Sequence, residues 1–471
     1  MGRIDLNDPA FERDPEFVKR RLAGIRQADS ARSLPKKVRA AVFDFLARRL
    51  PLKKQVLFYT IRDDGRLEGN ASALYPYIKG RKVIAARRLP HPGSYQLKMF
   101  WEIMRSRVIV TDDYVRYLRY FPLRKDQKVI QLWHACGAFK KFGRYGTNLK
   151  ESVDLASHAQ YDLVCVSGRA VRDIYADSFG IDREKVRALG APRTDIFFDR
   201  EKQEQVREAV YARYPQLRGR RVVLYAPTFR DSAAAAPAQQ NVDSAAAAPA
   251  QRPADAAPVD VSARDEAVAP AQHDGDEAAL ALAQQNVDSA AAAPAQQNGG
   301  EAATGAAVSA AAGRAVFRPE LDFDRLSEHL PDDMVFLVRP HPIMTAPVLT
   351  KTYDNVLEVR DLPTNDLMFV SDLMVTDYSS VIFEYSLLKK PMLFYCYDLD
   401  SYDRGFYLKY TDDLPGDVLR TQAELEERLS SDDLSRLGDG YEEFAERYMS
   451  ACDGKSSRRI ADIITRYMAG R

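Results

Sequence analysis

The sequence predicts an α/β protein with two parallel sheets, each in a domain of its own. Three observations support this prediction. Short apolar runs recur along the chain, and each ends in a polar cluster that precedes a helical pattern. The runs form two series, and a long Ala-rich segment separates them. Because parallel α/β sheets bind ligands at the carboxyl ends of their strands, we expect the polar clusters to line one crevice.

Residues 1–52 precede the first series and have a helical pattern rich in Arg and Lys. Within residues 35–50, apolar side chains recur at helical spacing and form one stripe, with basic residues beside it. The stripe consists of Val38, Ala41, Val42, Phe45, Leu46 and Leu50. Two interpretations stay open: the helix packs on its own domain, or it lies in the interface of an anionic membrane.

Residues 53–215 are expected to form the first Rossmann-like domain, because strand and helix patterns alternate there. A helix is expected near residues 71–78, and a Ser-initiated helix after the fifth strand. The strands are expected at residues 55–60, 82–86, 107–111, 126–132, 162–167 and 186–190.

Residues 216–430 are expected to form a second domain of the same kind, and residues 431–471 to form terminal helices. Its strands are expected at residues 221–225, 334–338, 356–359, 373–375 and 392–395. Residues 231–314 interrupt it with repeats of Asp-Ser-Ala-Ala-Ala-Ala-Pro-Ala-Gln and almost no large apolar residues. Such a composition cannot bury enough surface to fold, so we expect a disordered insertion in a surface loop.

Charge and cysteine content narrow the functional class. The chain has 68 Lys and Arg against 67 Asp and Glu, a net charge of +1, which does not indicate nucleic-acid binding. Its four cysteines are scattered without metal-like spacing, so we expect a reduced, cytoplasmic protein without a bound metal. We find no signal-peptide pattern and no apolar run near the roughly 20 residues that span a bilayer. We expect a protein that is soluble or attached to a membrane face.

His134 is a candidate general base. It follows an apolar run and Trp133, and a turn containing Gly137 comes next, followed by Lys140 and Lys141. Imidazole titrates near neutral pH, which suits proton abstraction from a hydroxyl. The alternative is a structural histidine that caps the turn.

His341 is a second candidate, and prolines on both sides fix its backbone. A rigid imidazole beside Arg339 can donate hydrogen bonds to phosphate oxygens with little reorganisation during the reaction. We therefore predict a catalytic role for His341 and phosphate binding by Arg339. The alternative is a rigid loop whose histidine caps backbone groups.

Two further clusters are predicted to bind a diphosphate. Asp377, Ser379 and Ser380 lie where a strand precedes a helix, and free N–H groups at a helix start favour anions. Thr228 and Arg230 follow another strand in the same way. Glycine-rich phosphate loops and paired metal-ligand motifs are absent, which argues against a P-loop kinase or an NAD enzyme. The sequence favours a nucleotide-diphosphate donor without cofactor or metal.

These motifs resemble the bacterial CDP-glycerol glycerophosphotransferases, which build poly(glycerol phosphate) teichoic acids and related cell-surface polymers. The resemblance covers about residues 53–230 and 316–450. It is carried by Gln-Leu-Trp-His at 131–134, Gly-Ala-Pro-Arg-Thr-Asp at 190–195, Tyr-Ala-Pro-Thr-Phe-Arg at 225–230, Arg-Pro-His-Pro at 339–342 and Thr-Asp-Tyr-Ser-Ser at 376–380.

The resemblance implies a GT-B-like fold, in which two Rossmann-like domains face a central cleft. It implies that the second domain holds CDP-glycerol or a related CDP-alditol and that the first faces the acceptor. His134 matches the proposed general base, while His341, Ser379 and Ser380 match contacts to the donor diphosphate. Residues 135–137 read Ala-Cys-Gly where some members have Gly-Thr-Pro, so the acceptor preference stays open.

The implied reaction transfers an alditol phosphate to a hydroxyl of a lipid-linked or polymer acceptor and releases CMP. Lys140 and Lys141 are expected to bind this anionic acceptor, and the basic helix to hold the protein at the cytoplasmic face of the membrane. Two other functions stay open: a glycosyltransferase that uses a nucleotide-sugar donor, and a non-catalytic scaffold at the membrane surface. The sequence does not separate glycerol from ribitol, or a primase from a polymerase.

Overall fold

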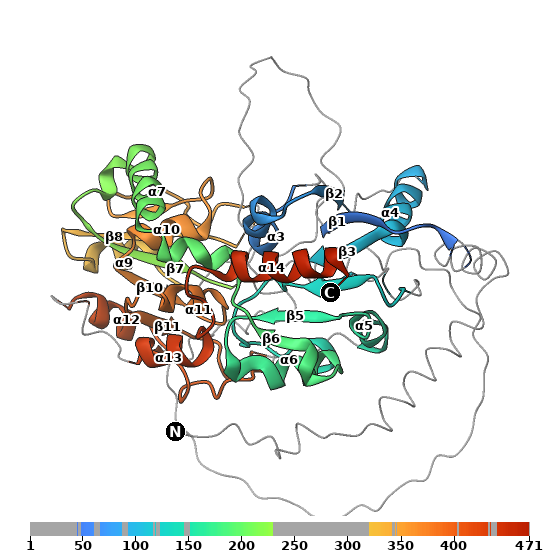
Figure 1. Ribbon diagram of the computed structural model, residues 1–471. Helices are drawn as coiled ribbons and strands as arrows, with labels where there is room; N and C mark the ends of the chain where they lie inside the picture. The colour runs from blue at the N-terminus through green and yellow to red at the C-terminus, as the bar shows by residue number, and fades with distance from the viewer. Residues whose placement is uncertain are drawn as a thin grey trace, which may run out of the picture.

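The computed structural model contains two six-stranded parallel sheets, which lie side by side (Figure 1). It describes residues 45, 49–60, 66–86, 93–115, 118, 123–145, 151–228, 320–341, 344, 346–402, 405–431, 434 and 440–470. The predicted insertion at residues 231–314, Arg230 and most of the predicted helix at residues 35–50 lie outside the described residues.

The first sheet has the strand order β2-β1-β3-β4-β5-β6, and its strand pairs are parallel. Residues 56–59 of β1 are all buried, as expected for a strand whose sheet is covered on both faces. The strands are β1 (Lys53–Thr60), β2 (Arg81–Ala86), β3 (Ser106–Thr111), β4 (Lys128–Gln131), β5 (Leu163–Val166) and β6 (Val186–Ala188). The helices among them are α3 (Gly69–Leu74), α4 (Gly93–Arg105), α5 (Glu151–His158) and α6 (Arg172–Phe179).

The second sheet has the order β12-β11-β10-β7-β8-β9, and its strand pairs are also parallel. The strands are β7 (Arg221–Ala226), β8 (Met334–Val338), β9 (Val356–Glu358), β10 (Leu373–Thr376), β11 (Met392–Tyr395) and β12 (Val418–Leu419). The helices are α9 (Phe323–His329), α10 (Thr364–Val370), α11 (Val381–Ser386) and α12 (Gln422–Leu429). Short 3-10 helices occur between these strands and helices: η2 (Tyr75–Tyr77), η4 (Gly143–Tyr145), η5 (Arg169–Val171), η6 (Arg183–Lys185), η7 (Pro192–Phe198) and η8 (Pro215–Leu217).

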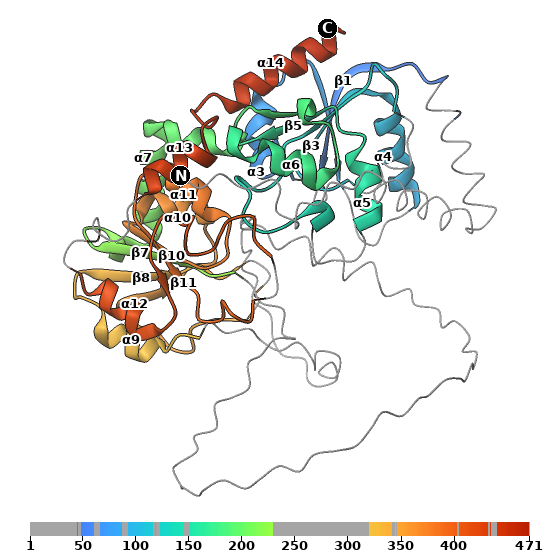
Figure 2. The ribbon, with the colours of Figure 1, turned by 90° about the horizontal axis from the view of Figure 1, so that it is seen from below.

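The chain passes between the two domains twice. It first crosses after η7, because the next helix, α7 (Arg200–Arg213), packs on α10 of the second domain. It crosses back after α13 (Tyr441–Tyr448), which packs on α11, into α14 (Ser456–Ala469), which packs on α3 and β3 (Figures 1 and 2). The two crossings touch, since a Cβ atom at Gly454 would lie 2.7 Å from the Cβ atom of Phe198.

Asp195 of the first domain caps the returning helix α14. Its Oδ1 accepts a hydrogen bond from the backbone N–H of Ser456 (2.9 Å), and its Oδ2 accepts one from that of Ser457 (2.8 Å). A carboxylate at this end of a helix satisfies free N–H groups and meets the positive end of the helix dipole. The cap therefore attaches the end of the chain to the first domain.

Buried apolar side chains of both domains form one continuous cluster. It contains Leu57 and Val164 of the first sheet together with Met374 and Phe383 of the second domain. Packing of this kind makes the domain interface resemble a protein interior, so it sets how the two domains sit. None of the helices in the described residues combines the length and apolar character needed to cross a bilayer.

Candidate active site

His134 lies just beyond the carboxyl end of β4, after a sharp turn at Trp133. Trp133 has a φ of 55°, a left-handed conformation that is uncommon outside glycine. The side chain of Gln131 accepts a hydrogen bond from the backbone N–H of Trp133 (2.8 Å), and Asn70 Nδ2 donates one to the Trp133 carbonyl (2.7 Å). The indole stacks on the imidazole of His134, with ring centroids 4.3 Å apart. The turn therefore fixes both the backbone and the ring of His134.

Asp113 stands beside the imidazole of His134. Its Oδ1 lies 3.5 Å from Nδ1 of His134, and the side chains of Asp113 and His134 are 14% and 15% exposed. The backbone N–H of Tyr114 donates to the same oxygen (2.6 Å), which holds the carboxylate in place. The carboxylate of Asp113 therefore lies beside Nδ1 of the imidazole, on the ring edge opposite Nε2, the nitrogen that a general base would use.

The loop that follows His134 packs directly on α11 of the second domain. Gly137 has a φ of 63°, and a Cβ atom there would lie 2.2 Å from the ring of Phe383. Tyr175 OH donates to the Gly137 carbonyl (2.9 Å), and Ser167 Oγ accepts from its N–H (2.9 Å). Only glycine fits this approach without displacing the ring.

Lys140 and Lys141, the predicted acceptor-binding residues, lie at the junction between the domains. The backbone N–H of Lys141 donates to the Gly405 carbonyl (2.8 Å), and Lys140 forms an isolated antiparallel bridge with Phe406. The Lys140 ammonium lies 5.7 Å from the ring centre of Tyr402. Their main chains therefore join the two domains beside the His134 loop.

Arg193 joins the main chain of His134 to α11. Its Nη1 donates to the His134 carbonyl (2.6 Å), and its Nη2 donates to Oε1 of Glu384 in α11. The side chains of Arg193 and Glu384 are 11% and 2% exposed. This buried ion pair crosses from the first domain to the second.

Thr228 and Asp377 lie together at the ends of β7 and β10. Oδ1 of Asp377 accepts hydrogen bonds from the backbone N–H groups of Thr228 (2.9 Å) and Tyr378 (2.6 Å). Thr376 Oγ1 adds a hydrogen bond to the Ala226 carbonyl (2.7 Å). The carboxylate of Asp377 thus holds two strand ends in register.

Arg339 and His341 lie at the end of β8, and both are buried. The backbone N–H of Arg339 donates to the Tyr225 carbonyl (2.8 Å), which anchors it beside β7. Within the described residues its guanidinium forms no salt bridge, only long contacts of 3.4 Å to the carbonyls of Pro340 and Val359. Burial, and then the charge of Arg360, lower the pKa of Arg339. A buried cation with such weak partners is suited to bind an anion.

Ser379 and Ser380 lie at the start of α11, as predicted. Ser380 is the N-cap residue and is buried, and Ser379 Oγ lies 3.5 Å from the backbone N of Val381. The structure thus brings these serines onto the same helix as Glu384, which contacts Arg193. Arg230, the other predicted phosphate ligand, lies outside the described residues.

Sequence reasoning gave no role to three residues that hold His134, namely Asp113, Asn70 and Arg193. Asp113 follows β3 in a Thr-Asp-Asp cluster, so the rule that polar residues follow apolar strands would have found it. Asn70 has no such signal, because it lies near the start of α3 and binds the turn at Trp133, 63 residues away. In the described part of the chain, no three His, Cys, Asp or Glu side chains form a group that could hold a metal ion.

Comparison with known families decides the relationship of the chain. The sequence model of the CDP-glycerol:poly(glycerophosphate) glycerophosphotransferase family matches residues 42–256 and 303–466. The chain belongs to this family. The resemblance inferred from the motifs is thereby confirmed.

Relatives of the chain include two proteins from Bacillus spizizenii. The chain is 30% identical to a teichoic acid ribitol-phosphate primase over 92% of its own length and 96% of the primase. It is 29% identical to a teichoic acid poly(ribitol-phosphate) polymerase over 91% of its own length, but spans only 60% of the polymerase. A teichoic acid glycerol-phosphate primase from Bacillus subtilis is 25% identical over 78% of this chain and 76% of that protein.

The fold is shared with a solved wall teichoic acid polymerase. A histidine variant of TagF superposes with a TM-score of 0.64 at 18% identity, covering 97% of this chain and 99% of that one. Together with the two parallel sheets, this match confirms the predicted GT-B-like architecture of two Rossmann-like domains.

Proposed function

We propose that this protein transfers an alditol phosphate from a CDP-alditol to a hydroxyl of a lipid-linked or polymer acceptor and releases CMP. The observation that carries the proposal is the setting of His134. Its imidazole is placed against Asp113, and its carbonyl is linked through Arg193 and Glu384 to the helix that begins at Ser380. The proposed base on one domain is thus joined to the helix that follows the proposed diphosphate-binding serines of the other.

In the proposed reaction, the acceptor hydroxyl oxygen attacks the β-phosphorus of the donor. Nε2 of His134 takes the hydroxyl proton, and Asp113 stabilises the resulting imidazolium. The bond from the β-phosphorus to the bridging oxygen breaks, and CMP leaves with that oxygen. Catalysis of this kind depends mostly on positioning and on stabilising charge.

The remaining predicted side chains supply the charge. Arg339, His341, Ser379 and Ser380 are proposed to bind the diphosphate, together with Thr228 and with Arg230, which follows Thr228 in the sequence. Asp377 is proposed to act through Thr228, because its carboxylate accepts the Thr228 N–H. Lys140 and Lys141 are proposed to attract the anionic acceptor.

Ribitol phosphate is proposed first as the transferred group. The two ribitol-phosphate relatives are 30% and 29% identical to this chain, against 25% for the glycerol-phosphate primase from Bacillus subtilis. Mass spectrometry of products from purified protein, a lipid-linked acceptor and CDP-ribitol or CDP-glycerol tests this choice. Addition of alditol phosphate with release of CMP supports the proposal. Transfer from a nucleotide sugar but from neither CDP-alditol would support a glycosyltransferase. Transfer from none of these donors would support a non-catalytic scaffold.

The same assay tests the two histidines. We expect His134→Ala and His341→Ala each to lower turnover by at least roughly 100-fold, a typical loss for a general base or a charge-stabilising group. Circular dichroism and thermal unfolding of both variants check that the fold is intact. Turnover near that of the wild type in both variants would contradict the assignment of this site.

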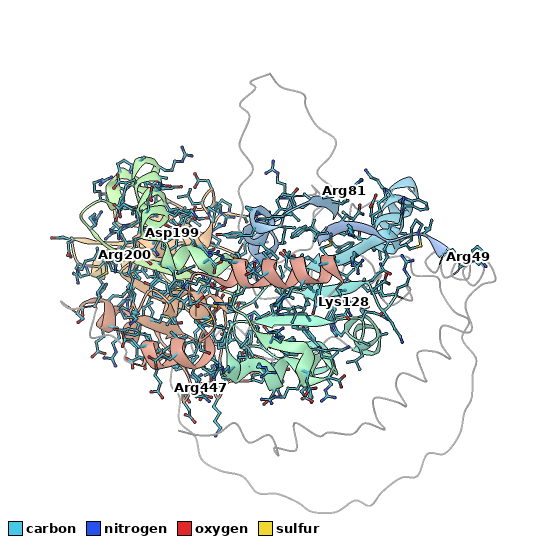
Figure 3. All side chains as sticks on the ribbon, viewed as in Figure 1. Arg49, Arg81, Lys128, Asp199, Arg200 and Arg447 are labelled. Atoms are coloured by element: carbon cyan, nitrogen blue, oxygen red, sulfur yellow. The ribbon has the colours of Figure 1, made fainter. Side chains whose placement is uncertain are left out.

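We also propose that the protein acts peripherally at the cytoplasmic face of the membrane. Phe45 is 55% exposed with Arg49 above its ring at 4.6 Å, and Trp101 is 39% exposed with Arg105 at 4.9 Å. Figure 3 places Arg49 at the outer edge of the first domain. Exposed aromatic and basic side chains are suited to the headgroup region.

Charge reversal on the predicted helix tests the membrane proposal. Each basic residue near an anionic surface contributes about 1 kcal/mol, so three reversals should greatly weaken co-sedimentation with anionic vesicles. Turnover on a soluble acceptor analogue should stay unchanged. Binding equal to that of the wild type would place attachment elsewhere, and unfolding would place the helix in the core. The variant changes three residues to Glu: Arg39, Arg48 and Arg49.

A further inference from the structure

We propose that Arg193 and Glu384 are a positioning pair that sets His134 relative to the domain that holds the donor. The inference rests on the proposed function, because it gives His134 the role of base. It adds a residue on each domain that acts on catalysis without touching the substrate.

The main chain around His134 is held by the side chains of Asn70 and Arg193, and the Asn70 side chain also binds the Arg193 backbone. Asn70 Nδ2 donates to the carbonyl before His134, at 2.7 Å, and Arg193 Nη1 donates to the carbonyl of His134 itself, at 2.6 Å. Oδ1 of Asn70 accepts the backbone N–H of Arg193 (3.0 Å). The left-handed turn at Trp133 is thus fixed on both sides.

Glu384 carries this framework into the second domain. All six residues of α11 are buried, and its Phe383 ring stacks on Phe444 with centroids 5.2 Å apart. A helix packed on every side has little freedom to shift. The start of this helix, at Ser380, therefore keeps a set distance from the His134 backbone as long as the ion pair is intact.

Stability alone does not account for a buried ion pair at this place. Removing two charges from water costs about as much as their attraction returns, and apolar replacements of similar volume are often neutral or stabilising. Apolar side chains, however, cannot bind a carbonyl and a carboxylate at once. The planar guanidinium does so in a fixed geometry, which a lysine ammonium cannot reproduce.

The thiol of Cys136 gives Glu384 no compensating charge. Burial first, and then the Glu384 carboxylate, raise the pKa of Cys136, so the thiol stays neutral beside it. In the described part of the chain, the salt bridge of the Glu384 carboxylate is the one to Arg193. Removal of either partner leaves a buried charge without its counterpart.

The experiment compares single and double replacements in the full chain. Arg193→Met and Glu384→Gln should each lower the thermal midpoint and lower kcat by about 100-fold, the loss expected for a displacement of about 1 Å. Arg193→Lys should lose about tenfold. The KM for the CDP-alditol should stay within about threefold of the wild type, because the donor contacts are not removed.

The double variant Arg193→Met/Glu384→Met separates positioning from stability. We expect its thermal midpoint to return toward that of the wild type while kcat stays about 100-fold low. Recovery of kcat together with the midpoint would overturn the proposal, as would single variants with kcat within about threefold of the wild type. Lys389→Met is the matched control, since it breaks an exposed ion pair with Glu442 and should change neither quantity.

A measurement without substrate distinguishes failure of the positioning pair from failure of the proposed function. In histidine-selective NMR, the imidazole resonance that is lost in His134→Ala should shift in the Arg193 variants and stay shifted in the double variant. Failure of the wild type to use any CDP-alditol would refute the proposed function alone. An unshifted His134 resonance in the double variant would refute the positioning pair alone.

Discussion

Replacing Gly137 with alanine measures how closely the loop after His134 packs on α11. The new Cβ atom would lie 2.2 Å from two atoms of the Phe383 ring. Carbon atoms in contact are separated by about 3.5–4.0 Å, so the loop or the ring must move by more than about 1 Å. Phe383 is fully buried and its ring stacks on Phe444, so the ring has no free space into which it could move.

The expected loss of stability has two parts. The φ of 63° costs a non-glycine residue roughly 1–2 kcal/mol, and overpacking of a core costs about 1–3 kcal/mol. Gly137→Ala should therefore lower the free energy of unfolding by about 2–5 kcal/mol. Each kcal/mol lost should lower the thermal midpoint by roughly 2–4 °C. Urea titration followed by circular dichroism measures the loss directly.

Gly219→Ala is the matched control for this prediction. Gly219 has a φ of 78°, and a Cβ atom there would have no neighbour within 4 Å. It retains the backbone strain without the clash, so its loss should be only about 1–2 kcal/mol. Equal losses in the two variants would refute the close packing of the His134 loop on α11.

Two further predictions concern pH and the low-complexity segment. Burial lowers the pKa of His158 from 6.5 to about 3, so the unfolded chain binds more protons than the folded one between these values. The free energy of unfolding should thus fall by about 1.4 kcal/mol per unit as pH drops below about 6.5, and His158→Phe should remove that slope in urea titrations. Equal slopes in both proteins would contradict this account. Deleting residues 232–314 and joining the ends with a Gly/Ser linker should leave turnover and thermal midpoint nearly unchanged, because the segment lacks core-forming residues. Loss of soluble protein would show that it packs on the fold.

Local pattern predicted most of the sheet framework. The strand expected at residues 334–338 is β8, and the one expected at residues 126–132 is the shorter β4. Buried parallel strands are apolar on both faces, so each appears as a short apolar run in the sequence. The same rule located His134, His341 and Ser380 at strand ends or at the following helix.

Partners distant in sequence could not be predicted in this way. Arg193 belongs to a recognised motif, but its partner Glu384 lies 191 residues further along the chain. Asp377 stays a predicted phosphate-binding residue, and the structure adds that its carboxylate accepts two backbone N–H groups. A polar residue after a strand has the same local pattern in either case, because only tertiary contacts determine what it binds.

The contact between Phe198 and Gly454 places the two connections between the domains against each other. Two covalent connections that lie against each other allow rotation about the line through them, while twisting would pull them apart. Figure 3 labels Asp199 and Arg200, which belong to the first connection. Asp195 caps the start of α14, which follows the second connection. If the packed interface opens, the two adjacent connections confine the motion to a single angle, which one pair of spectroscopic labels far from them is enough to report.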